Sequence, residues 1–331
     1  RAILTYLHAY YHDKKEYVAA LKLSKRLFVM SKDGIDAEGM IVALRSIFYN
    51  LSLLGQYDKV EKLVEDSEVE KYLSKSDILV YRIYTKLIKN YNKEAISDYE
   101  NSKPAIVGKM PASLLFNVAE AYFREGRYQE SIRLFDKFIS TYSYNTASSK
   151  ARLRIALSYD FLDKDIKKVG QLYKDTLNRS SDPEIRYEAG MRFIGLEYVR
   201  KYNRGENATD MLGFLTPPES IKDIVSINLK KLLWLTRLRT FIVEGKFEEA
   251  YQYLEAIPFE KMSLAEGKVI KLDASEILLG LVKDYYSKGK YSELIHLNEA
   301  ANSKYFKEIV TAPSRYILLA RSYLELGIET G

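Results

Sequence analysis

Two amphipathic segments joined at a glycine decide the fold of this chain, and they are clearest in Leu115-Phe-Asn-Val-Ala-Glu-Ala-Tyr-Phe-Arg-Glu-Gly-Arg-Tyr-Gln-Glu-Ser-Ile-Arg-Leu-Phe-Asp-Lys-Phe138. Apolar or small residues recur at i, i+3, i+4 and i+7 on both sides of Gly126, as on one face of a helix. Gly126 stands where the chain must reverse, and glycine adopts a left-handed conformation at little cost. Ala119 is small enough for close helix approach, whereas Tyr122 and Phe135 fill the space between helices. The stretch predicts a helix–turn–helix hairpin.

The same order of large, small and turn residues recurs along the chain. Besides residues 112–142, strong copies lie at 41–66, 231–257 and 275–300, with turns at Gly55, Gly245 and Gly289. The turn residues of the weaker and partial copies are Asn90, Asp163, Gly205 and Gly327, and an early copy contains Tyr11, Tyr17 and Ala20. We count nine candidate units, of which the last is truncated.

This pattern resembles the tetratricopeptide repeat (TPR), a helix–turn–helix unit of about 34 residues with large, small and aromatic residues at fixed offsets. The copy at 231–257 includes Trp234, near the start of its first helix, where the family favours Trp. The resemblance implies an all-α fold, a right-handed superhelical solenoid of antiparallel helix pairs. From Phe247 to Tyr291 one unit takes 44 residues, so we expect some longer inter-repeat loops or second helices.

A Pro-Pro pair interrupts the repeats. Residues 211–222, which contain Pro217 and Pro218, are the least repeat-like, and Pro-Pro cannot continue a helix. We therefore predict a first sub-array at 1–210, an irregular loop or kink at 211–222 and a second sub-array at 223–331 of one continuous superhelix. The chain starts at Arg1 inside a helical pattern and ends within a further copy, so we expect a fragment of a larger protein.

The composition argues against catalysis. The 331 residues carry a formal net charge of +6, no Cys and three His, which leaves no thiolate metal site and no cysteine nucleophile. There is no phosphate loop, dinucleotide fingerprint or zinc-protease motif, and no Ser or Asp has a His partner. His8 and His12 have i, i+4 spacing but no third ligand. We predict no catalytic residue, no cofactor and no metal.

Charge and hydropathy narrow the partner class. Basic residues are interleaved with acidic ones throughout, as on a solvated face, so we expect no nucleic acid partner. No apolar run approaches the roughly 18–20 residues of a membrane span.

The chain contains 28 Tyr, and we interpret six of them as interhelix filler because they fall on the aromatic positions of the repeat: Tyr57, Tyr122, Tyr128, Tyr285, Tyr291 and Tyr323. Tyr6, Tyr49, Tyr84 and Tyr202 are less clearly core.

The TPR resemblance also implies where a partner binds, because the first helix of each unit lines the concave side. The positions that face this groove in the family map onto Arg45, Tyr49, Asn117, Glu120, Arg124, Lys150, Arg154, Arg239, Lys283 and Arg321. Most are basic, which favours an acidic or carboxylate-ended segment. The alternative, that they form ordinary solvated helix faces, stays open.

One sub-pattern can be compared with a family clamp. Some TPR proteins grip a terminal carboxylate with side chains from three successive units. Asn117, Lys150 and Arg154 match its second and third parts, but Val80 and Tyr84 stand where the first belongs. We therefore do not predict a carboxylate clamp.

These observations predict a non-catalytic protein–protein interaction scaffold or adaptor that binds a protein or peptide along its concave face, within a larger assembly. The stretch 135–142, followed by Ala151 and Ala156, is similar to bacterial cell-envelope TPR proteins such as lipoprotein assembly factors and flagellar-motor collar scaffolds, which implies an envelope location. One alternative is a peptide-responsive regulatory module, which a continuous apolar pocket in the groove would favour. The other is a helical accessory domain of an enzyme whose catalytic part lies elsewhere. The oligomeric state is not predicted.

Overall fold

The computed structural model describes residues 2–106, 108–162, 165–206, 209–217, 219, 222, 225–262, 264–300 and 313–327. In these residues the chain forms seventeen α-helices and three short 3₁₀ helices, and none of them forms a strand. The all-α prediction is therefore confirmed. The chain divides into two compact units, Arg1–Asp165 and Ile166–Gly331, which are described separately.

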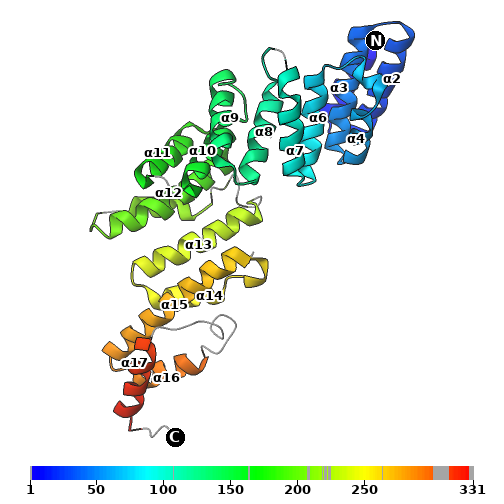
Figure 1. Cartoon of the computed structure of the whole chain (residues 1–331). Coiled ribbons are helices and arrows are strands. Elements are labelled where there is room, and N and C mark those ends of the chain that lie inside the picture. Colours follow the sequence, from blue (N-terminus) through cyan, green and yellow to red (C-terminus); the bar gives the residue numbers. More distant parts are fainter. Residues whose placement is uncertain are drawn as a thin grey trace. The chain divides into compact units, whose positions relative to one another are not determined.

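The first unit is a succession of helices that pack on their neighbours in the chain (Figure 1). Its helices are α1 (Ala2–Asp13), α2 (Tyr17–Asp33), α3 (Ala37–Leu53), α4 (Tyr57–Val64), α5 (Ser67–Glu70), α6 (Lys75–Ile88), α7 (Asn92–Ser102), η1 (Lys103–Ala105), α8 (Ala112–Arg124), α9 (Tyr128–Thr141) and α10 (Ser148–Phe161). Helix α6 contacts both α7 and α8, and α8 contacts both α9 and α10. The first helix of a hairpin therefore touches its own partner and the first helix of the next hairpin.

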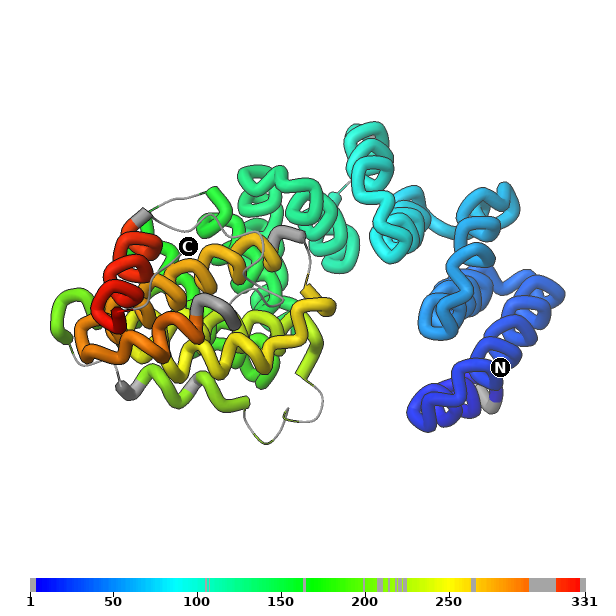
Figure 2. The backbone as a smooth tube through the Cα atoms, turned by 90° about the horizontal axis from the view of Figure 1, so that it is seen from below, coloured from blue at the N-terminus to red at the C-terminus, as the bar shows by residue number. Residues whose placement is uncertain are grey.

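The second unit repeats this contact pattern. Its helices are α11 (Ile166–Arg179), α12 (Pro183–Tyr202), η2 (Thr209–Leu215), α13 (Ile227–Val243), α14 (Phe247–Glu255), η3 (Phe259–Lys261), α15 (Leu264–Ser287), α16 (Tyr291–Ala300) and α17 (Pro313–Glu325). Helix α13 contacts α14 and α15, and α15 contacts α16 and α17. Figure 2 shows α17, in red, beside the orange helices α15 and α16.

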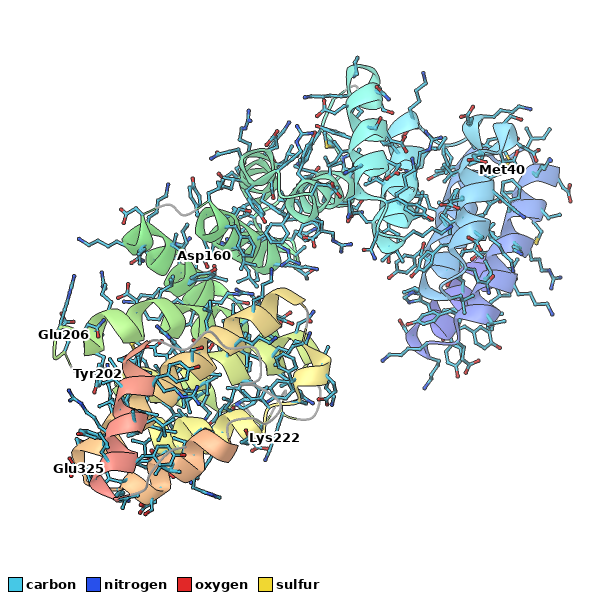
Figure 3. All side chains as sticks on the ribbon, turned by 60° about the horizontal axis from the view of Figure 1, so that its bottom comes forward. Met40, Asp160, Tyr202, Glu206, Lys222 and Glu325 are labelled. Atoms are coloured by element: carbon cyan, nitrogen blue, oxygen red, sulfur yellow. The ribbon has the colours of Figure 1, made fainter. Side chains whose placement is uncertain are left out.

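One turn geometry joins most of the hairpins. A residue with positive φ follows the first helix, and the next N–H bonds the carbonyl five residues back, as Arg127 N does to Tyr122 O at 2.9 Å. Tyr202 and Glu206 flank another copy, labelled in Figure 3. The predicted turn residues with positive φ are Gly55, Asn90, Gly126, Gly205, Gly245, Gly289 and Gly327. Asp163 lies outside the described residues.

Two left-handed turn residues were not predicted. Lys15, between α1 and α2, has φ 59°, and Ile35, between α2 and α3, has φ 53°. Neither is a glycine or asparagine, although Gly34, with φ −84°, directly precedes Ile35. Asp36 caps the following helix α3, because its side chain accepts a hydrogen bond from Gly39 N.

The buried residues follow the predicted large and small positions. Ala119, Ser131 and Phe135 are fully buried, and Tyr122 is 2% exposed. The other five tyrosines assigned as interhelix filler, at positions 57, 128, 285, 291 and 323, are half-buried. This partial burial is compatible with a place between helices, and the assignment of these five stays a prediction.

The longest predicted unit is explained by one long helix. The 44-residue interval from Phe247 to Tyr291 holds the 24-residue helix α15, preceded by the short η3. The extra residues therefore lie in the inter-repeat segment, as one of the two expected alternatives has it, and in the first helix of the next pair, whereas the second helix α14 has only nine residues.

The segment around the prolines is only partly described. Residues 209–215 form the 3₁₀ helix η2, which contacts α12 and α13, whereas Pro218 lies outside the described residues. The boundary between the two compact units lies at Asp165–Ile166, earlier in the chain than this segment. The interruption of the repeats at 211–222 stays a prediction. Within the described part of the chain, no helix is both long enough and apolar enough to cross a membrane.

Candidate functional site

The best-formed pocket of the first unit opens over three successive hairpins. It has a volume of about 460 Å³. Helices α3, α6, α8 and α9 and the segment that follows α9 supply its lining, which consists of Tyr49, Ser52, Leu53, Val80, Tyr81, Tyr84, Ala112, Ser113, Phe116, Asn117, Phe138, Asn145 and Ala147. Most of these side chains are aromatic or aliphatic, so the pocket suits an apolar group.

Aromatic side chains of the pocket wall pack against other aromatic rings. Tyr81 stacks on the buried Phe48 with ring centroids 4.2 Å apart, and Phe116 meets Phe138 edge-on at 5.4 Å. Tyr49 stacks on His12 at 5.3 Å. These contacts fix the rings before any ligand arrives, which reduces the entropy lost on binding.

Few polar groups face this aromatic surface. The amide of Asn117 is half-buried and makes no hydrogen bond to the residues that the structure describes. The hydroxyl of Ser52 is already engaged, because it donates to Phe48 O at 2.8 Å. Burial raises the pKa of Tyr81 to about 12, so its hydroxyl stays protonated at neutral pH. Asn117 can donate and accept at once, as recognition of a peptide main chain requires.

The predicted cationic residues of the first unit do not form a bare basic groove. Both carboxylate oxygens of Asp77, on α6, accept from Arg45 Nη2 on α3, at 3.1 Å each. Lys150 is exposed, and its ammonium lies 5.8 Å from the centre of the Phe116 ring. Much of the positive charge that favoured an acidic partner is therefore compensated locally.

Glu120 is the centre of a buried ion-pair network. It is 3% exposed and accepts from Arg154 Nε at 2.8 Å, Arg154 Nη2 at 3.0 Å and Arg124 Nε at 3.3 Å. Burial would raise the pKa of Glu120, but Arg154, together with the charges of Lys150 and Arg124, holds it below its usual range. Arg124 also donates to Leu87 O at 2.9 Å. These side chains join α6, α8 and α10 and are engaged within the protein.

The remaining predicted residues lie in the second unit. Arg239, on α13, donates to Asp273 at 3.2 Å and to Glu276 at 2.6 Å, both on α15. Lys283 on α15 and Arg321 on α17 are exposed. The structure thus brings Tyr49 and Asn117 together in one pocket and places Glu120, Arg124 and Arg154 in one network.

Sequence reasoning missed the acidic partners and half of the pocket. The ion pairs join residues 32, 34, 34 and 37 positions apart: Arg45–Asp77, Arg154–Glu120, Arg239–Asp273 and Arg239–Glu276. A search for carboxylates about one repeat length from each arginine would have found them. Val80 and Tyr84 lie beside Tyr49 in the pocket. The comparison with the carboxylate clamp had already placed both residues at groove positions, and this placement could have predicted an apolar pocket there.

No group of three or more His, Asp or Glu side chains in the described residues is arranged to hold a metal ion. No protein-family model matches the chain, and no curated protein is found to resemble it.

Proposed function

We propose that this chain is a non-catalytic, TPR-like peptide-binding protein whose first unit seats a large apolar side chain of a partner protein in its aromatic pocket. The observation that carries the proposal is the pocket itself. Its aromatic side chains pack against other rings, and the amide of Asn117 at its wall makes no hydrogen bond to the described residues. An apolar side chain would enter between Tyr49, Tyr84 and Phe116 while Asn117 binds the adjacent peptide group.

Two regularities support the TPR-like assignment. The turn with a left-handed residue and an N–H bonded five residues back recurs in both units. The ion pairs between successive first helices join residues separated by close to one repeat length. A stack of equivalent hairpins accounts for both, because equivalent positions of neighbouring units then face each other.

The test is selection of peptides from a random dodecamer library on the full chain, followed by affinity measurement for the enriched peptides. We expect enrichment of a bulky apolar residue. Ser113→Trp places an indole at the exposed rim of the pocket and should weaken binding about ten- to hundredfold, since burial of one such side chain contributes about 1.5–3 kcal/mol. Gln129→Trp, on an exposed position of α9 outside the lining, is the matched control.

Equal affinity of the selected peptides for wild type and Ser113→Trp would overturn the proposal, as would failure to enrich any peptide. Enrichment of acidic peptides that are insensitive to Ser113→Trp would instead support the basic groove inferred from the sequence.

A peptide-responsive regulator is the second candidate, and one observation favours it. The pocket walls come from three successive hairpins, α3–α4, α6–α7 and α8–α9. An occupant would therefore touch all three at once and restrain their relative motion. Hydrogen exchange with and without a selected peptide separates the two readings: a regulator requires slowed exchange beyond the lining residues, whereas a passive scaffold requires only local protection.

A further inference from the structure

A second pocket lies in the second unit. It contains an arginine, which suggests a positively charged site, but its carboxyl groups outnumber that arginine. It has a volume of about 540 Å³ and lies among α12, α13 and α15. Its lining consists of Gly195, Leu235, Thr236, Arg239, Val269, Leu272, Asp273 and Glu276. Its charged groups are one guanidinium and two carboxyls, so negative charge is in excess when both carboxyls are ionised.

Asp273 is the buried member of this set. It is 7% exposed, and one carboxyl oxygen, Oδ1, accepts from Arg239 Nη1 at 3.2 Å. Its other oxygen makes no hydrogen bond to the described residues, although Asp273 lines the cavity. This oxygen is open to the cavity, and a carboxylate gains more from a charged hydrogen-bond donor than from a neutral one. A cationic donor that enters the pocket would supply the missing partner.

The charges that face Asp273 agree with this incomplete pairing. Burial raises the pKa of Asp273 to about 6; Arg239 on α13 opposes that rise, and Glu276 on α15 adds to it. Helix α12 contributes only Gly195 to the lining and therefore no charge. Arg239 also donates a hydrogen bond to Glu276 at 2.6 Å, so its positive charge does not fully compensate the negative charge of Asp273.

The walls suit the stem of a long basic side chain. Leu272 is 71% exposed and Val269 is 46% exposed, both at the pocket, and Leu235 is half-buried there. Lysine and arginine bury their methylene groups along apolar surface while the charged end reaches a polar partner. The pocket offers both surfaces at once.

Gly195 keeps one side of the pocket open. It lies inside helix α12, where glycine costs about 1 kcal/mol relative to alanine. An added Cβ there would meet no atom within 4 Å, so no helix packing requires the glycine. The empty space in front of it belongs to the pocket.

We propose that this pocket binds the lysine or arginine side chain of a partner protein, with its charged end at Asp273 and Glu276 and its stem against Leu272. The site is independent of the aromatic pocket in the first unit. It also reverses the role inferred for Arg239 from the sequence, because Arg239 here orients the carboxyls and does not attract an acidic segment.

The test is a methyl-NMR titration of the full chain with N-acetyl-arginine methylamide, against the neutral isostere N-acetyl-citrulline methylamide. We expect saturable shifts of the Leu235, Val269 and Leu272 methyl signals with arginine and none with citrulline. Binding should weaken as the pH is lowered from 7.5 toward 5.5, because Asp273 then takes up a proton and loses its charge.

Four variants make the result specific. Gly195→Leu should fill the open side and abolish the shifts, whereas Gly195→Ala should retain them. Glu276→Gln should weaken binding about two- to fivefold, as expected for a partly exposed ion pair. Glu255→Gln removes the same charge from an exposed position of α14 and should have no effect.

The proposal is overturned if citrulline binds as well as arginine, or if Gly195→Leu binds unchanged. It is equally overturned if acetate, and not arginine, shifts these signals, since that result would make Arg239 the recognition group.

Discussion

Glu120 is a charged residue buried where two helices of the first unit approach. Its carboxylate pairs with Arg154 from α10 and Arg124 from its own helix, α8. A buried ion pair gains little over an apolar pair, but loss of one partner leaves the other uncompensated. The network therefore fixes the register of α8 against α10 and is poorly suited to bind an external ligand.

We expect Glu120→Gln to lower the free energy of unfolding by about 2–3 kcal/mol, measured by urea denaturation followed by circular dichroism. The value lies below the usual cost of breaking a buried pair because the Arg154 side chain, at 21% exposure, still reaches water. The double variant Glu120→Met, Arg154→Met should recover most of the loss. A Glu120→Gln variant as stable as wild type would mean that the network contributes nothing to the fold.

His8 gives the first unit a pH-dependent contact. The amide nitrogen of the buried Asn50 donates to His8 Nε2 at 3.0 Å, so this ring nitrogen must be unprotonated. Burial, and then the charge of His12, lower the pKa of His8 below its ordinary 6.5. As the pH falls through 6.5, the unfolded state therefore takes up a proton before the folded state does, and stability is lost.

We expect the urea midpoint of wild type to fall more than that of His8→Gln between about pH 7.5 and about pH 5.5. Gln can still accept from Asn50 but does not titrate. Asp273 affects stability in the opposite direction, because its raised pKa lets the folded state take up a proton before the unfolded state does. Both proteins contain Asp273, so its contribution cancels when their pH profiles are compared. Parallel pH profiles for the two proteins would show that His8 does not titrate with folding.

The turn between α2 and α3 is formed by an unfavourable residue. Ile35 is 89% exposed and adopts φ 53°, a conformation that β-branched side chains strongly disfavour. Ile35→Gly should therefore raise the free energy of unfolding by about 1 kcal/mol. Gly55→Ala, at the equivalent turn after α3 with φ 67°, should lower it by about the same amount. Thermal unfolding measures both, and destabilisation by Ile35→Gly would indicate that the Ile35 side chain makes contacts in the native state.

These turns show how far the sequence determines the elements. Helical periodicity and glycine are local signals, so the hairpins around Gly126 and Gly245 were predicted together with their turn residues. The turns at Lys15 and Ile35 were missed because the left-handed residue at each turn is neither glycine nor asparagine. The acidic partners of Arg45 and Arg239 were missed because they lie on other helices. Their positions follow only when successive hairpins are placed side by side.

Each compact unit contains its own buried residues and its own pocket. In the first unit, one buried cluster surrounds Phe48 and another surrounds Phe135, whereas Leu278 belongs to a cluster of the second unit. All lining residues of the aromatic pocket fall between positions 49 and 147, and those of the pocket around Asp273 fall between 195 and 276. The chemistry proposed for each pocket therefore depends on one unit only.

A cut between Asp165 and Ile166 leaves the internal contacts of each unit in place, and repeat arrays are stabilised mainly by contacts between neighbours. We expect fragments 1–165 and 166–331, expressed separately, to be helical by circular dichroism and to unfold cooperatively. Fragment 1–165 should bind the selected apolar peptides within about threefold of the full chain, and fragment 166–331 should not bind them. A folded 1–165 fragment without peptide affinity would place the binding surface outside the aromatic pocket, whereas an unfolded fragment would show that its buried clusters need the rest of the chain.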